Sequence, residues 1–145
     1  METKSIIAKA DTTINASVDV VWKALVTPST IKKYMFGSDV VSDWREGAAI
    51  RWKGQWKGTF YEDKGVILEM APPKKLSYSH FSPLTGESDI PENYHTVTIE
   101  LNQKGSSTDV SLTQDNNKNE DGKRHSEKNW SQMLSSLKQV VEQDN

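Results

Sequence analysis

The last part of the chain carries the pattern that most restricts its fold, an amphipathic helix that follows a long run of β-type sequence. Its apolar residues recur at steps of three and four, the spacing of one helix face: Trp130, Met133, Leu134, Leu137, Val140 and Val141. We therefore predict a helix over residues 121–143. Its apolar face must be buried against another element, and the strands before it are the available partner.

The residues before this helix predict a sheet and two short helices. Ser17 is suited to cap a helix at 18–27, and Pro28 is suited to the first turn of a second one at 29–35. Alternating apolar and polar residues predict strands at 5–14, 40–44, 48–52, 56–70, 75–81, 96–102 and 108–114.

Short connections between consecutive strands favour antiparallel pairing. The sequence therefore predicts an α+β fold for one domain spanning residues 1–145. We expect a curved antiparallel sheet of about six to seven strands around the long C-terminal helix, with two short helices after the first strand.

Composition excludes several classes of protein. The 18 basic and 20 acidic residues leave a net charge of −2, which gives no field for nucleic acid or an anionic membrane. The chain has no cysteine, so disulfides and thiolate metal sites are excluded. No apolar run approaches the roughly 20 residues of a membrane span, and residues 1–9 lack the apolar core of a signal peptide. We expect a cytoplasmic protein without a nucleic-acid partner or membrane insertion.

Basic and aromatic residues interleave between Arg51 and Lys57, as they do on platforms that bind single-stranded nucleic acid. The net charge argues against that function. On a strand, lysines that alternate with tryptophans at a period of two lie on the opposite face. A solvated outer face therefore explains Lys53 and its neighbours.

The chain contains five tryptophans, three of them between residues 44 and 56. Such large amphipathic rings either fill a core or line a pocket, and both interpretations remain open. A cavity between the sheet and the last helix is the expected pocket. The candidate ligand-binding residues are Trp52, Trp56, Phe60, Tyr78, His80, Tyr94, Trp130, Met133 and Leu137.

The connection 82–95 is long for a hairpin, and loops of this length often border binding sites. We expect it to lie at the mouth of the cavity. Its polar candidates are Asp89, Glu92, Tyr94 and His95.

Catalytic and metal signals are weak. His80, His95 and His125 show no metal-ligand spacing, and the chain has neither a phosphate-binding glycine loop nor a nucleophile elbow. Glu62 and Asp63 are adjacent, so on a strand they would face opposite ways, and a local turn or a surface pair with Lys64 is expected. We expect no metal, no cofactor and no catalytic residue, with His80 as a general base in the pocket as the alternative.

Three segments carry a resemblance to a known family. Residues 15–28, Asn-Ala-Ser-Val-Asp-Val-Val-Trp-Lys-Ala-Leu-Val-Thr-Pro, resemble the opening of the START-like (SRPBCC) helix-grip superfamily. Residues 64–76 resemble the middle motif of the family named after the activator of the 90-kDa heat-shock protein ATPase. Asn129 and Trp130, with Leu134 and Leu137, are similar to its closing helix.

The resemblance covers nearly the whole chain, with two departures. Tyr34 stands where relatives often carry tryptophan, and the sequence starts at the first strand, so we expect it to lack the further N-terminal domain of chaperone activators. The resemblance implies the helix-grip fold, which serves many functions.

Three functions remain in competition. The first is binding of a small apolar or amphipathic molecule, the second is a protein-interaction module that regulates a chaperone ATPase, and the third is a polyketide cyclase-like or hydrolase-like enzyme. A cavity of roughly a few hundred Å³ would favour the pocket hypotheses, and a filled interior would argue against both.

Overall fold

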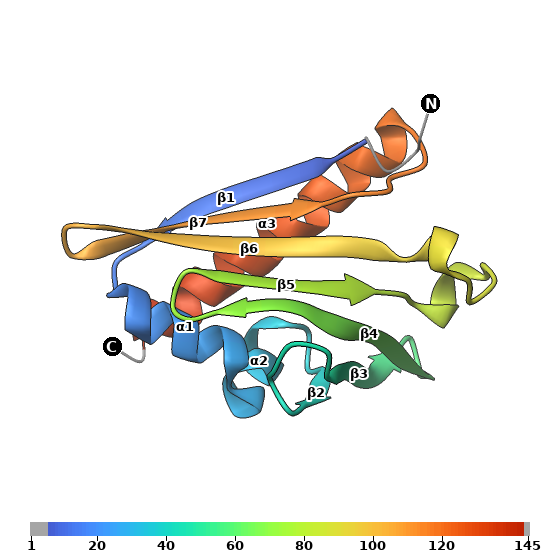
Figure 1. Cartoon of the computed structure of the whole chain (residues 1–145), viewed down its shortest axis with the longest axis horizontal. Helices are drawn as coiled ribbons and strands as arrows, with labels where there is room; N and C mark the ends of the chain where they lie inside the picture. Colours follow the sequence, from blue (N-terminus) through green and yellow to red (C-terminus); the bar gives the residue numbers. More distant parts are fainter. Residues whose placement is uncertain (1–5, 144–145) are drawn as a thin grey trace.

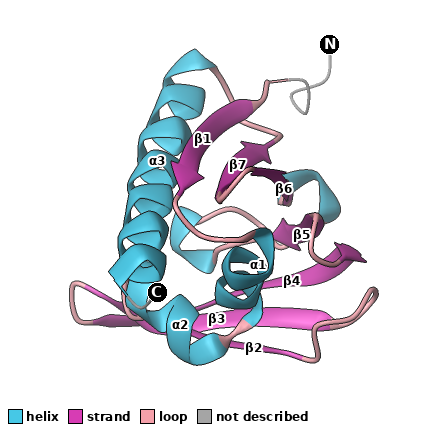
Figure 2. Ribbon diagram, turned by 90° about the vertical axis from the view of Figure 1, so that its left-hand side faces the viewer, coloured by secondary structure: helices cyan, strands magenta, loops and turns pink. Residues whose placement is uncertain are grey.

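A seven-stranded antiparallel sheet curls around one long helix in the computed structural model, which describes residues 6–143 apart from the side chain of Trp56 (Figure 1 and Figure 2). The strand order is β1-β7-β6-β5-β4-β3-β2. The strands are β1 (Ala8–Ile14), β2 (Asp39–Ser42), β3 (Ala49–Trp56), β4 (Thr59–Ala71), β5 (Lys75–His80), β6 (His95–Lys104) and β7 (Ser107–Gln114).

The helices are α1 (Val18–Val26), α2 (Pro28–Tyr34) and α3 (Glu120–Gln143), with short 3-10 turns at η2 (Pro83–Thr85) and η3 (Pro91–Asn93). The predicted helix-grip fold is confirmed. Ser5, the first residue of the predicted opening strand, lies outside the described residues. No helix within residues 6–143 is both long and apolar enough to cross a membrane.

Local signals place the two short helices as expected. The Ser17 hydroxyl accepts a hydrogen bond from the Val20 amide at 3.4 Å and caps α1, and Pro28 occupies the first turn of α2. The Tyr34 hydroxyl donates to the Ala24 carbonyl oxygen at 3.0 Å, which ties α2 to α1.

We call the space between the concave face of the sheet and α3 the seam. At one end, the closed end, α1 and α2 lie beside the last turns of α3 (Figure 2). Apolar side chains of β1, β7, α1 and α3 pack this end and are fully buried: Ile14, Val21, Val110, Leu112, Leu134 and Leu137. Its core therefore follows the helix and strand faces that the sequence predicts.

The β3–β4 hairpin differs from the sequence prediction. Gly54 falls in the gap between the predicted strands 48–52 and 56–70, but it lies within β3, where a Cβ atom would come 2.7 Å from the Tyr61 hydroxyl oxygen. The turn falls at Lys57 and Gly58, whose φ angles of 50° and 80° are those of a tight hairpin turn. Close packing of Tyr61, rather than a turn, explains Gly54.

Candidate functional site

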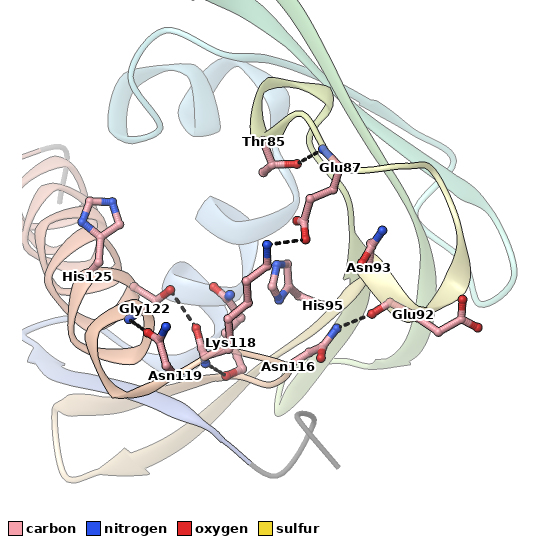
Figure 3. A pocket seen from close by; sticks show the side chains of 13 residues that line it. Thr85, Glu87, Glu92, Asn93, His95, Asn116, Lys118, Asn119, Gly122 and His125 are labelled. Carbon is pink, nitrogen blue, oxygen red and sulfur yellow. Dashed lines mark hydrogen bonds and ion pairs between the residues drawn. The ribbon is translucent and has the colours of Figure 1, made fainter. Parts of the chain in front are cut away.

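Polar residues gather at the opposite end of the seam, which we call the open end. There a cleft of about 690 Å³ lies between the first turns of α3 and the loop that carries η2 and η3 (Figure 3). Its lining combines amides, carboxylates, a lysine and two histidines: Thr85, Glu87, Glu92, Asn93, His95, Gln114, Asn116, Asn117, Lys118, Asn119, Gly122, His125 and Ser126.

Three asparagines order the segment between β7 and α3, which forms one wall of the cleft. Asn116 has a φ of 60°, which asparagine tolerates, and its side-chain amide donates to the Glu92 carbonyl oxygen at 2.8 Å. Asn117 donates to the Gln114 carbonyl oxygen at 3.1 Å. Asn119 accepts from the Gly122 amide at 2.8 Å and caps α3. Asn116 and Asn117 are buried, although the segment between the predicted strand and helix consists of polar residues.

An ion pair joins the two sides of the open end. The Lys118 ammonium lies 2.8 Å from a Glu87 carboxylate oxygen, so the segment before α3 is tied to the loop after η2 (Figure 3). Lys118 holds the pKa of the Glu87 carboxyl below its ordinary value. The Thr85 hydroxyl accepts from the Glu87 amide at 3.2 Å and fixes the loop locally.

The cleft meets the interior at Gln114. This residue continues the inward face of β7 after Val110 and Leu112, and its side-chain oxygen accepts a hydrogen bond from the indole N–H of Trp130 on α3. Met133 follows Trp130 by one helical turn and is buried. Gln114 and Trp130 therefore separate the polar cleft from the apolar seam.

The interior beyond this contact is nearly filled. A void of about 20 Å³ remains, enough for about one water molecule, since a void needs roughly 10–15 Å³ to hold one. Trp52, Tyr78, Tyr34 and Met133 are among its lining residues. The Trp52 and Tyr78 ring centroids lie 5.1 Å apart. The roomy apolar cavity that the sequence predicted is absent from the described residues, because these large side chains occupy the seam.

Burial also sets the chemistry of the two inner tyrosines. It raises the pKa of the Tyr78 hydroxyl and of the Tyr34 hydroxyl well above their ordinary values. Both side chains therefore remain neutral hydroxyls at physiological pH.

A polar pair lies on the inner face beside Trp52. His80 Nε2 lies 3.0 Å from Asp63 Oδ2, and the His80 ring packs edge-on against the Trp52 ring, with centroids 5.1 Å apart. The other carboxylate oxygen, Asp63 Oδ1, is buried and has no hydrogen-bond partner within the described part of the chain.

Neighbouring charges in β4 are engaged elsewhere. Glu62 pairs with Arg51 across the hairpin at 2.7 Å, and Lys64 pairs with Asp89 of the long loop. The expected local turn or surface pair of Glu62 or Asp63 with Lys64 was wrong, because β4 runs unbroken through these residues. Strand alternation sends Asp63 to the inner face, where the sequence offered no indication of a partner.

The structure brings together some of the candidate ligand-binding residues. Trp52, Tyr78 and Met133 line the small void, and His80 adjoins Trp52. Trp130 lies half-buried beside the cleft, and Leu137 is fully buried toward the closed end.

The remaining candidates lie apart or undescribed. Phe60 is 63% exposed on the β3–β4 hairpin. Tyr94 stacks on Phe81 at 5.2 Å between ring centroids and donates its hydroxyl to Asp89 at 2.6 Å. The side chain of Trp56 lies outside the described residues. Of the loop candidates, Glu92 and His95 line the cleft.

Sequence reasoning missed Gln114, Asn116, Asn117 and Lys118 as cleft residues. Gln114 could have been found, because it falls two residues after Leu112 on an inward strand face. The Asn116-Asn117 pair was also a usable signal, since asparagine favours left-handed backbone and side chain-to-backbone hydrogen bonds.

The sequence matches a known family model over residues 15–142, that of the "Activator of Hsp90 ATPase homolog 1-like protein". Comparison with curated protein sequences finds no significant match.

Solved structures agree with this match. A protein from Cytophaga hutchinsonii, known from its solution structure, is 56% identical with a TM-score of 0.86, and the alignment covers 99% of this chain and 98% of that one. The Aha1 dimer from Colwellia psychrerythraea is 22% identical, covers 93% of this chain and 95% of that one, and has a TM-score of 0.73. CalU16 from Micromonospora echinospora is 23% identical over 90% of this chain and 73% of that one, with a TM-score of 0.72. The last two share the fold.

Proposed function

Because this chain belongs to the family of Activator of Hsp90 ATPase homolog 1-like proteins, which carry the helix-grip fold, we propose that it binds a small amphipathic molecule at the open end of the seam. One observation carries the proposal: the cleft of about 690 Å³ opens directly onto the boundary between sheet and α3. Ligand sites in proteins usually measure about 300–1,000 Å³, so this cleft has the right size.

The cleft offers both donors and acceptors to the polar part of a ligand. His95 Nδ1 lies 3.0 Å from the Asp115 carbonyl oxygen. A carbonyl only accepts, so Nδ1 carries the proton, and a neutral His95 keeps a lone pair on Nε2. Glu87 and Lys118 add a charge of each sign on facing walls.

The apolar part of the ligand would contact Trp130 at the inner end of the cleft. Displacing the side chain of Gln114 from the indole N–H would open the way toward Met133. Each Å² of apolar surface that leaves water contributes about 25 cal/mol to binding. An amphipathic ligand gains from both regions, which is why we prefer it to a wholly apolar one.

Substitution of Gly122 tests the proposal without removing any side chain. Gly122 lines the cleft, and a Cβ atom there would meet only the Asn119 side-chain oxygen at 3.5 Å. Gly122→Phe should fill the cleft, whereas Gly122→Ala, the matched control, should leave it open.

Native mass spectrometry of protein purified gently from its own host should find a retained small molecule on the wild type and on Gly122→Ala, and none on Gly122→Phe. Retention by all three proteins, or by none of them, would contradict binding in the cleft.

Protein binding is the second candidate function, and the nearly filled interior favours it. Large apolar side chains also remain exposed, with Phe36 71%, Phe60 63% and Val41 56% accessible. ATPase assays of an Hsp90-type chaperone test this candidate. A rate change with wild-type protein that Phe60→Ser reduces would support it, and an unchanged rate at saturating protein would remove it.

A further inference from the structure

The inner wall of the seam holds one carboxylate whose hydrogen bonding is incomplete. Asp63 Oδ2 contacts His80 Nε2, whereas Asp63 Oδ1 is buried and has no partner within the described residues. A buried acceptor without a donor is costly, and the cost is higher for a charged group. Such atoms in folded proteins call for a water, an ion or a ligand that completes them.

The surroundings of Asp63 favour a cation as that missing donor. The nearby cations Arg51 and Lys64 lie on the outer face of the sheet, where they pair with Glu62 and Asp89. Asp63 lies directly opposite Trp52 in the register of β3 and β4. Aromatic faces attract cations, and an ionised carboxylate does so more strongly.

The cleft lies close to this position in the sheet. His80 lies directly opposite His95 in the register of β5 and β6, and His95 lines the cleft. Directly opposed side chains on one face of a sheet have Cβ atoms about 4.5–5.5 Å apart. The side chains of His80 and Asp63 are 26% and 15% exposed, so the pair lies at the margin of the inner wall rather than deep inside it.

We propose that Asp63, His80 and Trp52 form a subsite for the protonated amine of an amphipathic ligand. The ammonium donates to Asp63 Oδ1 beside Trp52, and His80 holds Oδ2 so that Oδ1 remains the free acceptor. The apolar body of the ligand extends past His95 toward Trp130 at the inner end of the cleft, and the amine is its inner polar end. This inference rests on the proposed function, because the amine is one end of the molecule bound there.

Three probes with one apolar body separate the inference from the proposed function: naphthylmethylamine, naphthylmethanol and methylnaphthalene. Isothermal titration of each into the full-length wild-type chain at neutral pH should give amine binding about tenfold or more tighter than binding of methylnaphthalene, since hydrogen bonds to charged groups are the strong ones. Asp63→Asn should abolish the preference and leave methylnaphthalene binding unchanged. Glu62→Gln, the matched control one residue away on the outer face, should retain it.

Each other outcome is decisive. Equal binding of the three probes to the wild type overturns the amine subsite and leaves the proposed function standing, and it requires no variant to fold. Binding of none overturns both. A preference that survives Asp63→Asn, or disappears in Glu62→Gln, assigns the amine to another position and overturns this subsite. His80→Gln, which keeps a donor toward Oδ2, should retain most of the preference.

Discussion

Along the same helix, the closed end of the seam is lined by apolar side chains and the open end by polar ones. At the closed end, α3 presents Leu134, Leu137 and Val141 to the sheet, and all three are buried. At the open end, the helix contributes Gly122, His125 and Ser126 to a polar cleft. The comparison indicates that the closed end supplies more of the apolar burial, which is the dominant favourable term in folding, than the open end does.

The largest expected effect is at the closed end. Leu137→Ala should lower the free energy of unfolding by about 2–5 kcal/mol, because Leu137 is fully buried and its truncation leaves a cavity. Ser135→Ala, an exposed neighbour on the same helix, should change it by less than about 0.5 kcal/mol. Urea denaturation measures both. A similar small loss for each would mean that the closed end does not carry the stability.

At the boundary between the two ends, Gln114→Leu should lower the free energy of unfolding by about 1–3 kcal/mol, because the partly buried Trp130 N–H loses its acceptor. The double variant Gln114→Leu/Trp130→Phe removes both polar partners and should recover part of this loss. A double-mutant cycle measured by chemical denaturation gives the interaction free energy between Gln114 and Trp130. Strictly additive losses would show that the hydrogen bond is not the cause.

The fold was predictable because its information lies in spacing. The steps of three and four in α3 and the alternation in β6 and β7 follow from which faces are buried, and neither depends on exact packing. The positions of the turns were harder to predict from the sequence. Gly54 has a packing role that a single sequence cannot distinguish from a turn, and the Lys57-Gly58 turn carries only one glycine.

The candidate site was predictable only in part. The loop after β5 was expected at the mouth, and Glu92 and His95 do line the cleft. The size of the interior void was not predictable, because it depends on how the rings of Trp52 and Tyr78 pack. The Asp63–His80 pair was missed for a related reason, since the register that brings β4 and β5 together is a property of the whole sheet.

At the open end, Gly122→Ala should stabilise the chain by about 0.5–1 kcal/mol, because glycine in a helix loses more backbone entropy than alanine. The Cβ atom has space, with the nearest neighbouring atom at 3.5 Å. Thermal denaturation measures the gain. A loss of stability would indicate that this part of α3 is under a packing constraint like that of the closed end.

The smallest expected effect concerns the Glu87–Lys118 ion pair. It should contribute less than about 1 kcal/mol to the free energy of unfolding, because Lys118 is largely exposed. The pKa of Glu87 is lowered from 4.5, so its contribution is present above that value and is lost as the pH falls through the lowered pKa.

Lowering the pH should therefore loosen loop 82–94 in the wild type, and NMR spectra recorded along an acid titration would detect the change. In Lys118→Gln the same loop should already be loose at neutral pH. Lys104→Gln, which removes an ion pair with Asp109 at the far hairpin, is the control and should leave the loop unchanged. A loop insensitive to both acid and Lys118→Gln would show that its other contacts, such as the Lys64–Asp89 ion pair and the asparagine hydrogen bonds, are sufficient to hold it.

The uneven anchoring of α3 has a mechanical consequence. The second half of α3 packs against the sheet through buried apolar side chains. Its first turns are held by individual hydrogen bonds, such as those from the Lys9 amide to Glu127 at 3.0 Å and from the Ser126 hydroxyl to Asn117 at 2.9 Å. Links of this kind break and reform one at a time, whereas a packed core yields only as a unit. The first turns of α3 should therefore open locally at a lower free-energy cost than its second half.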